Sequence, residues 1–357
     1  MTYLDDFEFF GNVHKAHDFI DALKSGNFLF SLVISYTETC EISGITFAGA
    51  DKDSIQFTPP ADAEYLYYGY CKTIDKIPMT PDGKPTPALL TKTALESCSI
   101  PHVVINAGSK IPPQLPFIHT GLVHGKNISV ESAMSDSQVS QAVDYGRMVG
   151  RSLASLTDCL IIGESIPGGT TTALAVLRGL GFKAKVSSSI PNNPVELKNQ
   201  IVNLALGRLT SDNPYHVIAE VGDPMIAFVS GMLSSASEIT KVMLAGGTQM
   251  AAVLAFASKI GFNEQNTAIG TTSYISNDNN ANFTSLVSEI ADIPVISVNP
   301  GLENSNFSGL KAFSQGFAKE GVGAGGSIIA SMIKTGNDST HFLTLSEKEY
   351  HRLFTSL

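Results

Sequence analysis

The sequence is poor in charged residues and lacks the clusters that mark several common classes of protein. Only 16% of its 357 residues are charged, the formal net charge is −10, and no lysine- or arginine-rich cluster is present. Nucleic-acid binding depends on such clusters to displace counterions from phosphates, so the composition argues against nucleic acid as a partner. A low charged fraction also favours burial of surface between subunits, which predicts a homo-oligomer.

Cysteine and histidine motifs are missing as well. Cys40, Cys71, Cys98 and Cys159 are scattered without a C-x-x-C pair, so we expect reduced thiols rather than disulfides or metal ligands. The eight histidines form no H-E-x-x-H motif and no group at metal-ligand spacing, so no metal site is predicted. The acidic start of the chain has no basic segment of a secretion signal, and the early apolar run at 28–34 is too short to cross a bilayer. We therefore expect a cytoplasmic protein that does not contact a membrane.

Segments with strand and helix character alternate along most of the chain. We expect strands at 28–34, 102–106, 159–162, 242–245, 267–273 and 295–298. We expect helices at 14–24, 138–155, 171–180, 195–206, 224–235, 249–259 and 325–334. This alternation predicts a three-layer α/β fold with a mostly parallel, Rossmann-like sheet that binds ligands at the carboxyl ends of its strands.

Residues 44–92 interrupt the alternation. They are rich in Gly, Pro and Thr and are expected to be irregular. A coil-prone stretch of this length usually belongs to a binding site or to an interface between subunits. The sequence leaves open which of the two applies here.

The most informative segment covers residues 160–171, which have the pattern of an apolar strand, a glycine-rich turn and the start of a helix. It nearly matches the phosphate-binding P-loop, but Gly169 stands where that motif has its lysine. Backbone N–H groups of Gly168, Gly169, Thr170 and Thr171 can still converge on a phosphate. Without the lysine the loop suits a monophosphate better than ATP, and a purely structural turn is the alternative. A similar unit at 246–248 is interpreted as the same turn used a second time.

Two carboxyl groups and one lysine near these turns are candidates for chemistry. Glu320 lies in a second glycine-rich run and is either a general base with a raised pKa or an acceptor of hydrogen bonds at a helix start. The residues alone do not decide between these roles, and Glu164 has the same two interpretations. Lys198 lies in an expected helix and has the reach to contact a phosphate, yet the residues alone favour a solvated surface position.

Together these motifs resemble the nicotinate-nucleotide–dimethylbenzimidazole phosphoribosyltransferase family of cobalamin biosynthesis, in particular its divergent, largely uncharacterised branch. The segments that carry the resemblance are Gly163-Glu164, Gly168-Gly169-Thr170-Thr171, residues 190–198, residues 221–227 and residues 320–324. They are similar to the family's glutamate-containing loop, its phosphate-holding segment, its Val-Gly-Gly helix start and its Gly-Glu-Gly-x-Gly-Ala motif. Gly169 stands in place of a family asparagine and Pro167 in place of a small aliphatic residue, and the first third of the chain does not match.

The resemblance implies transfer of the 5-phosphoribosyl group of nicotinate mononucleotide to an aromatic N-heterocycle of benzimidazole or purine type. It also implies residue roles: Glu320 as general base supported by Gly321 and Gly323, and Glu164, Gly168, Gly169, Thr170, Thr171 and Lys198 as nucleotide-binding residues. No cofactor is needed, and a homodimer is expected. The alternatives are a nucleosidase or transferase that uses another donor, and a non-catalytic mononucleotide-binding protein.

For the domain organisation, we expect a single phosphoribosyltransferase-like unit over residues 1–357. Its α/β core is expected at about 95–300, and parts of 1–30 and 305–357 are expected to form a small helical subdomain.

Overall fold

The computed structural model describes residues 3–46, 48–49, 53–187 and 193–354. Within these ranges eight strands form one sheet in the order β1-β8-β7-β6-β5-β2-β3-β4. The strands are β1 (Phe7–Gly11), β2 (Phe28–Ile34), β3 (His102–Asn106), β4 (Ile118–His119), β5 (Cys159–Ser165), β6 (Lys241–Ala245), β7 (Thr267–Thr272) and β8 (Pro294–Val298). Neighbours run parallel except β1, which pairs antiparallel with β8. The predicted mostly parallel sheet is confirmed, and β1 and β4 are additions to it.

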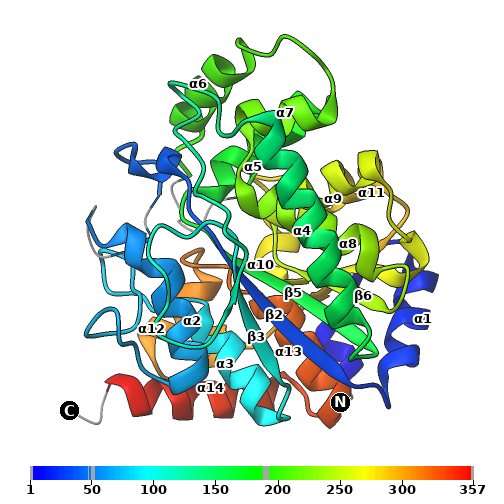
Figure 1. Cartoon of the computed structure of the whole chain (residues 1–357). Helices are drawn as coiled ribbons and strands as arrows, with labels where there is room; N and C mark the ends of the chain where they lie inside the picture. Colours follow the sequence, from blue (N-terminus) through cyan, green and yellow to red (C-terminus); the bar gives the residue numbers. More distant parts are fainter. Residues whose placement is uncertain (1–2, 47, 50–52, 188–192, 355–357) are drawn as a thin grey trace.

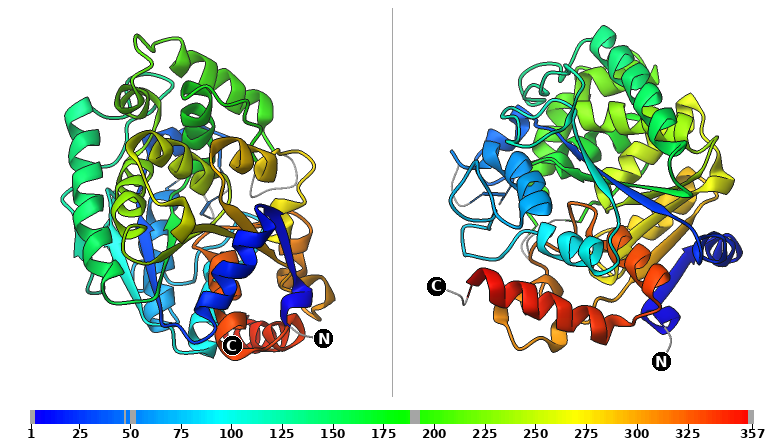
Figure 2. Two further views of the ribbon diagram at one scale, coloured as in Figure 1. Left: turned by 90° about the vertical axis from the view of Figure 1, so that its right-hand side faces the viewer. Right: turned by 60° about the horizontal axis from the view of Figure 1, so that its bottom comes forward.

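Helices cover both faces of the sheet (Figures 1 and 2). The α-helices are α1 (Val13–Leu23), α2 (Thr58–Tyr68), α3 (Ala88–Ser97), α4 (Asp136–Ala154), α5 (Gly169–Gly179), α6 (Val195–Leu206), α7 (Pro214–Val221), α8 (Pro224–Ala236), α9 (Thr248–Ile260), α10 (Ser273–Ser276), α11 (Phe283–Ile290), α12 (Ser308–Ser314), α13 (Ala324–Thr335) and α14 (Ser339–Phe354). Side chains of α4–α9 and α11 pack in one core, and those of α1–α3 and α12–α14 pack in the other. Over the described ranges, none of these helices combines the length and the apolar character needed to span a membrane.

Strand β5 shows why the sheet needs a helical layer on each side. Leu160 and Ile162 belong to the core under α4–α9, whereas Cys159 and Ile161 belong to the opposite core. Successive side chains of a strand point to opposite faces, so a run of apolar residues with no polar alternation requires burial on both sides. The apolar character of this strand therefore leads directly to the three-layer architecture.

The order of the strands fixes the place where a ligand can bind. β2 lies between β3 and β5, so the chain builds the sheet outward from β2 through β3 to β4, and then from β5 through β6 and β7 to β8. In open parallel sheets, ligands bind outside the carboxyl ends of the strands where the direction of building changes. That position lies here at the ends of β2 and β5.

Residues 44–92 are not irregular throughout, which corrects the expectation from the sequence. They contain all of α2 and the first half of α3. Pro59 and Pro60 occupy the first turn of α2, where the missing N–H groups are not needed. Residues 59–66 of α2 are all buried, so the helix has no polar face and no helical period in its hydrophobicity. Both features hid the helix in the sequence.

The contact between α4 and α8 depends on glycines in both helices. A Cβ atom on Gly146 would lie 2.0 Å from the carbonyl oxygen of Phe228, and one on Gly231 would lie 2.2 Å from that of Val143. Both distances are far shorter than atoms tolerate, so the two helix backbones touch directly only because neither glycine carries a side chain.

We predict that Gly146→Ala and Gly231→Ala each lower the free energy of unfolding by about 1–3 kcal/mol, because the helices must move apart. Urea unfolding of the purified protein measures this change. Gly207→Ala is the matched control, since a Cβ there would have its nearest neighbour at 3.4 Å. Equal stability of Gly146→Ala and Gly207→Ala would contradict the close contact of α4 and α8.

Candidate active site

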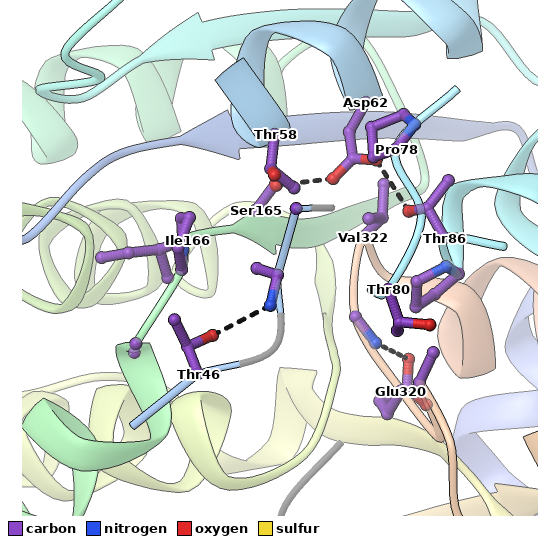
Figure 3. A pocket seen from close by; sticks show the side chains of 18 of the residues that line it. Thr46, Thr58, Asp62, Pro78, Thr80, Thr86, Ser165, Ile166, Glu320 and Val322 are labelled. Atoms are coloured by element: carbon purple, nitrogen blue, oxygen red, sulfur yellow. Dashed lines mark hydrogen bonds between the residues drawn. The ribbon is translucent and has the colours of Figure 1, made fainter. Parts of the chain in front are cut away.

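A cavity of about 890 Å³, open to solvent, lies at the carboxyl end of β5 (Figure 3). The turn after β5 forms one wall, and the loop that precedes α13 forms another. Parts of the segment 45–87 complete the cavity, which answers the question about residues 44–92: within the described residues they line the pocket.

The cavity brings most of the predicted site residues together. Its lining includes Glu164, Gly168, Gly169, Thr170, Glu320 and Gly321. Thr171, Lys198 and Gly323 are not part of the lining. The Oγ1 atom of Thr171 is buried in the first turn of α5 and has no hydrogen-bond partner among the described residues. The loop from the end of the chain and the turn after β5 therefore share one cavity, as the general-base hypothesis requires.

A close contact of β5 with the loop before α13 positions Glu320. The Val322 N–H donates a hydrogen bond of 2.9 Å to the backbone oxygen of Glu164. A Cβ atom on Gly163 would lie 2.9 Å from the Cα of Gly323. Gly323 itself has a φ of +74°, and a Cβ atom there would lie 2.7 Å from the ring of Phe30. Glycine is thus required on both sides of the contact, by space and by backbone conformation.

Glu320 accepts hydrogen bonds at the start of α13. Its Oε1 accepts from the N–H groups of Gly321 and Gly325 at 3.1 Å each, and its Oε2 accepts from the N–H of Thr272 at 2.9 Å. The helix-start interpretation of Glu320 is therefore confirmed. Burial nevertheless raises the pKa of Glu320 to about 7, although these N–H groups oppose the shift. A carboxyl group with this pKa can exchange a proton near neutral pH.

Glu164 is a second buried carboxyl group of the cavity, at the end of β5. Burial, and after it the nearby charges of Asp223 and Glu320, raises the pKa of Glu164 to about 8. Asp223 caps α8 by accepting from the Ile226 N–H at 2.9 Å, and burial raises the pKa of Asp223 to about 6. Because these groups are close together and buried, they do not all ionise at neutral pH.

Asp62 is a cavity residue that the sequence analysis missed. It lies in α2, and its carboxyl group accepts hydrogen bonds from Thr86 Oγ1 at 2.7 Å and Ser165 Oγ at 2.8 Å. Figure 3 shows this group of three on a different side of the cavity from Glu320. Burial raises the pKa of Asp62 to about 7. The signal that could have revealed α2, and with it Asp62, is the proline pair at the start of the helix.

A smaller cavity adjoins the first one. Thr170, Glu164 and Glu320 line it together with Ser187, Gly247 and Thr248. The second glycine–glycine–threonine unit thus lies at the site, although the sequence favoured a purely structural turn. Helices α5 and α9 both begin here, and helix N-termini present backbone N–H groups and positive potential to anions.

Lys198 does not have the solvated surface position that its sequence context favoured. Only 1% of it is exposed, and its Nζ has no hydrogen-bond partner among the described residues. Burial, and after it the charge of Lys319, lowers the pKa of Lys198 to about 8. The lysine is on the inner face of α6 because it follows Pro194 by one turn and lies beside the buried Ile201 and Val202. The first residues of the segment 190–198 lie outside the described ranges.

Comparisons with known proteins identify the family. A family model described as phosphoribosyltransferase matches residues 96–273. A UPF0284 protein of Archaeoglobus fulgidus is 46% identical over 331 residues, which are 93% of this chain and 95% of that protein. A UPF0284 protein of Sulfurisphaera tokodaii is 42% identical, over 94% of this chain and 97% of that one. The chain belongs to the UPF0284 family.

The matched family model makes this UPF0284 protein a phosphoribosyltransferase, of a divergent branch as the motifs predicted. The structure of a nicotinate-nucleotide–dimethylbenzimidazole phosphoribosyltransferase from Thermus thermophilus is similar to it with a TM-score of 0.59 at 17% identity. That likeness covers 89% of this chain and 83% of the other and confirms the α/β fold. Residues 96–273 include the turn after β5 and Lys198 but not Glu320.

We predict that replacing Glu164 changes how stability depends on pH. Its pKa rises from 4.5 to about 8 on folding, so the folded protein holds a proton that the unfolded chain releases, and stability falls as pH rises through this window. Glu164→Gln cannot titrate, so its loss of unfolding free energy between about pH 5 and about pH 8 should be smaller than that of the wild type.

Urea unfolding at the two pH values measures the difference. The control is Glu289→Gln, whose side chain is exposed and should leave the pH dependence unchanged. An unchanged pH dependence in Glu164→Gln would contradict the buried, mostly protonated state of this carboxyl group.

Proposed function

We propose that the protein transfers the 5-phosphoribosyl group of nicotinate mononucleotide to an aromatic N-heterocycle of benzimidazole or purine type, in synthesis of the lower ligand of cobalamin. The products are an α-ribosyl phosphate and nicotinate. The observation that carries the proposal is the shared cavity: the carboxyl group of Glu320 and the turn Gly168–Thr170 line the same space. The name of the solved relative from Thermus thermophilus supports this choice of donor and acceptor.

Binding of the donor depends on its 5′-phosphate. The first turn of α5 presents the backbone N–H group of Thr170, while that of Gly169 donates a hydrogen bond of 3.3 Å to the Ile166 oxygen. Gly168 has the left-handed conformation that starts this turn, with a φ of +74°. Thr171 and Lys198 are buried polar groups without partners among the described residues, so a phosphate would satisfy them. Fixing the phosphate holds the ribose C1′ in one place, and this positioning is a large part of the catalysis.

The chemical step needs one base and no acid. The bond between C1′ and the pyridinium nitrogen breaks, and its electron pair neutralises the ring, so nicotinate leaves without protonation. One nitrogen of the acceptor attacks C1′ from the opposite face, while the proton on its other nitrogen goes to the carboxylate of Glu320. A positioned base of this kind contributes about 10²–10⁴-fold to the rate. Glycosidases, by contrast, need a second carboxyl group because their leaving group must be protonated.

The acceptor occupies the part of the cavity between Glu320 and the group formed by Asp62, Thr86 and Ser165. Pro78, Pro87 and Val322 supply apolar surface for a flat ring there. Glu164 orients the substrate beside the base, and Gly321 and Gly323 hold the loop in place. A homodimer is part of the same proposal, and the exposed apolar side chains of Val130, Met148 and Leu156 are compatible with contact to a second copy.

Two alternatives remain to be separated from this reaction by experiment: a transferase or nucleosidase that uses another donor, and a protein that binds a mononucleotide without turnover. We predict that the wild type releases nicotinate from nicotinate mononucleotide when an azole or purine acceptor is present. Glu320→Gln should lower kcat by about 10²–10⁴-fold, because the amide cannot accept the proton. Chromatographic measurement of released nicotinate follows the reaction.

Glu289→Gln, in which an exposed carboxyl group is replaced, should keep the wild-type rate. Binding of ribose 5-phosphate should persist in Glu320→Gln. A wild-type protein that releases no nicotinate with any azole or purine acceptor would refute the proposed reaction, whereas binding without turnover would favour the non-catalytic alternative.

We also predict that phosphate binding weakens as pH rises through about 8. The pKa of Lys198 is about 8, so the side chain loses its charge above this pH, whereas a phosphate monoester is already doubly charged above about pH 6. Calorimetric titration with ribose 5-phosphate at about pH 7 and about pH 9 measures the effect. Lys198→Met should bind about 10–100-fold more weakly at neutral pH and lose this pH dependence. A variant with wild-type affinity would show that Lys198 does not contact the phosphate.

A further inference from the structure

Three side chains from separate segments, Ser187, Asp278 and Lys319, form a hydrogen-bonded group beside the smaller cavity, and the reaction above uses none of them. The Nζ of Lys319 donates a hydrogen bond of 2.6 Å to Oδ2 of Asp278, and Oγ of Ser187 donates to the same oxygen. Lys198 is close enough for the Lys319 charge to act on it. Ser187 itself lines the smaller cavity, so the cluster borders the space in which α5 and α9 begin.

The charges of this cluster do not balance. Lys319 and Asp278 neutralise each other, and their side chains are only 11% and 7% exposed. Lys198 adds a second ammonium group that is 1% exposed and has no partner among the described residues. An unpaired buried cation is unfavourable, and a second cation nearby makes its burial more so. A bound anion would remove both costs, and perturbed buried lysines of this kind are typical of functional sites.

Lys319 directly precedes the proposed base, Glu320, in the loop before α13. Its side chain extends to Asp278. Its backbone oxygen also accepts a hydrogen bond of 2.8 Å from Thr272 Oγ1. The lysine is therefore held at both its backbone and its side chain.

We propose that Lys319 is a second phosphate-binding cation, positioned by Asp278 and Ser187, that together with Lys198 holds a phosphate monoester at the edge of the smaller cavity where Ser187 lines it. The identity of the nucleotide rests on the proposed function, but the phosphate site does not.

Glu164 and Glu320 also line the smaller cavity, but burial raises their pKa values to about 8 and about 7, so both are partly protonated near neutral pH. The group of Lys198, Lys319 and Asp278 carries a net charge of +1 when both lysines are charged, which attracts a dianion. Because Lys319 and Glu320 are adjacent, binding of the phosphate by Lys319 also fixes the loop that carries the base.

Calorimetric titration of the full chain with ribose 5-phosphate, with inorganic phosphate as a second probe and ribose as the phosphate-free control, tests the proposal. Lys319→Met should bind both phosphates about 10–100-fold more weakly. Asp278→Asn removes a negative charge from the site but keeps a side-chain oxygen that can accept the hydrogen bond of Lys319, so it should bind them equally well or more tightly. Lys319→Arg keeps the charge and should stay within about threefold of the wild type. Lys183→Met, at an exposed lysine, is the matched control and should change nothing.

The two variants separate a ligand site from a merely structural ion pair, since each of them breaks the pair of Lys319 and Asp278. If Asp278→Asn weakens binding as much as Lys319→Met does, or if Lys319→Met binds like the wild type, the proposal is overturned. Its failure differs from failure of the proposed function. A wild type that binds ribose 5-phosphate but releases no nicotinate refutes only the reaction, and a Lys319→Met variant with an unchanged KM for nicotinate mononucleotide refutes only this site.

Discussion

The contact of Gly163 with Gly323 is the constraint on which the rest of the site depends. It allows a loop from near the end of the chain to lie directly on the central strand β5, where the hydrogen bond of Val322 to Glu164 fixes it. A side chain at either position would hold the loop away from the strand. Glu320 would then lose its place beside Glu164, and the cavity would lose a wall. The position of the polar groups at this site thus depends on two residues, Gly163 and Gly323, that have no side chain.

Acidic and basic groups lie close together at the site. Glu164 and Glu320 line both cavities and Asp62 lines the larger one, whereas Lys319 pairs with Asp278 beside Ser187, a lining residue of the smaller cavity. Burial raises the pKa of each of the three carboxyl groups, so part of their negative charge is absent at neutral pH. An anionic ligand can therefore approach carboxyl groups that would repel it if all were ionised. Burial thus has two effects: it raises the pKa of Glu320 into the range useful for a base, and it reduces the repulsion between the carboxyl groups and a bound phosphate.

The sequence predicts those parts of the structure that depend on local pattern. The strands at 28–34 and 102–106 agree to the residue, since continuous apolar runs leave little choice in a doubly covered sheet. The prediction failed for α2, where the burial of all residues from 59 to 66 removes the helical period, and for β1, a short edge strand that includes the charged Glu8. Lys198 was expected at the surface because its burial depends on packing between distant segments, which a helical pattern does not contain.

For the candidate site too, the sequence predicts the local features but not the contacts between distant segments. The turn after β5 and Glu320 were recognised because glycine-rich motifs are local, and the structure places them together in one cavity. The partners of Glu320, by contrast, come from β7 and α13, and those of Asp62 from β5 and the segment before α3. No spacing in the sequence encodes these pairs. They follow from strand order, which decides which loops share an edge of the sheet.

The place of β2 determines how the chain can be divided. The stretch that matches the phosphoribosyltransferase model starts at residue 96, whereas β2 ends at Ile34 and hydrogen-bonds to β3 on one side and β5 on the other. A fragment limited to the matched stretch would lack β2. The edges of β3 and β5 that pair with it would then have unpaired backbone N–H and C=O groups, and such edges promote aggregation with other chains. The stretch that the family model matches therefore forms a complete sheet only together with the segments that flank it.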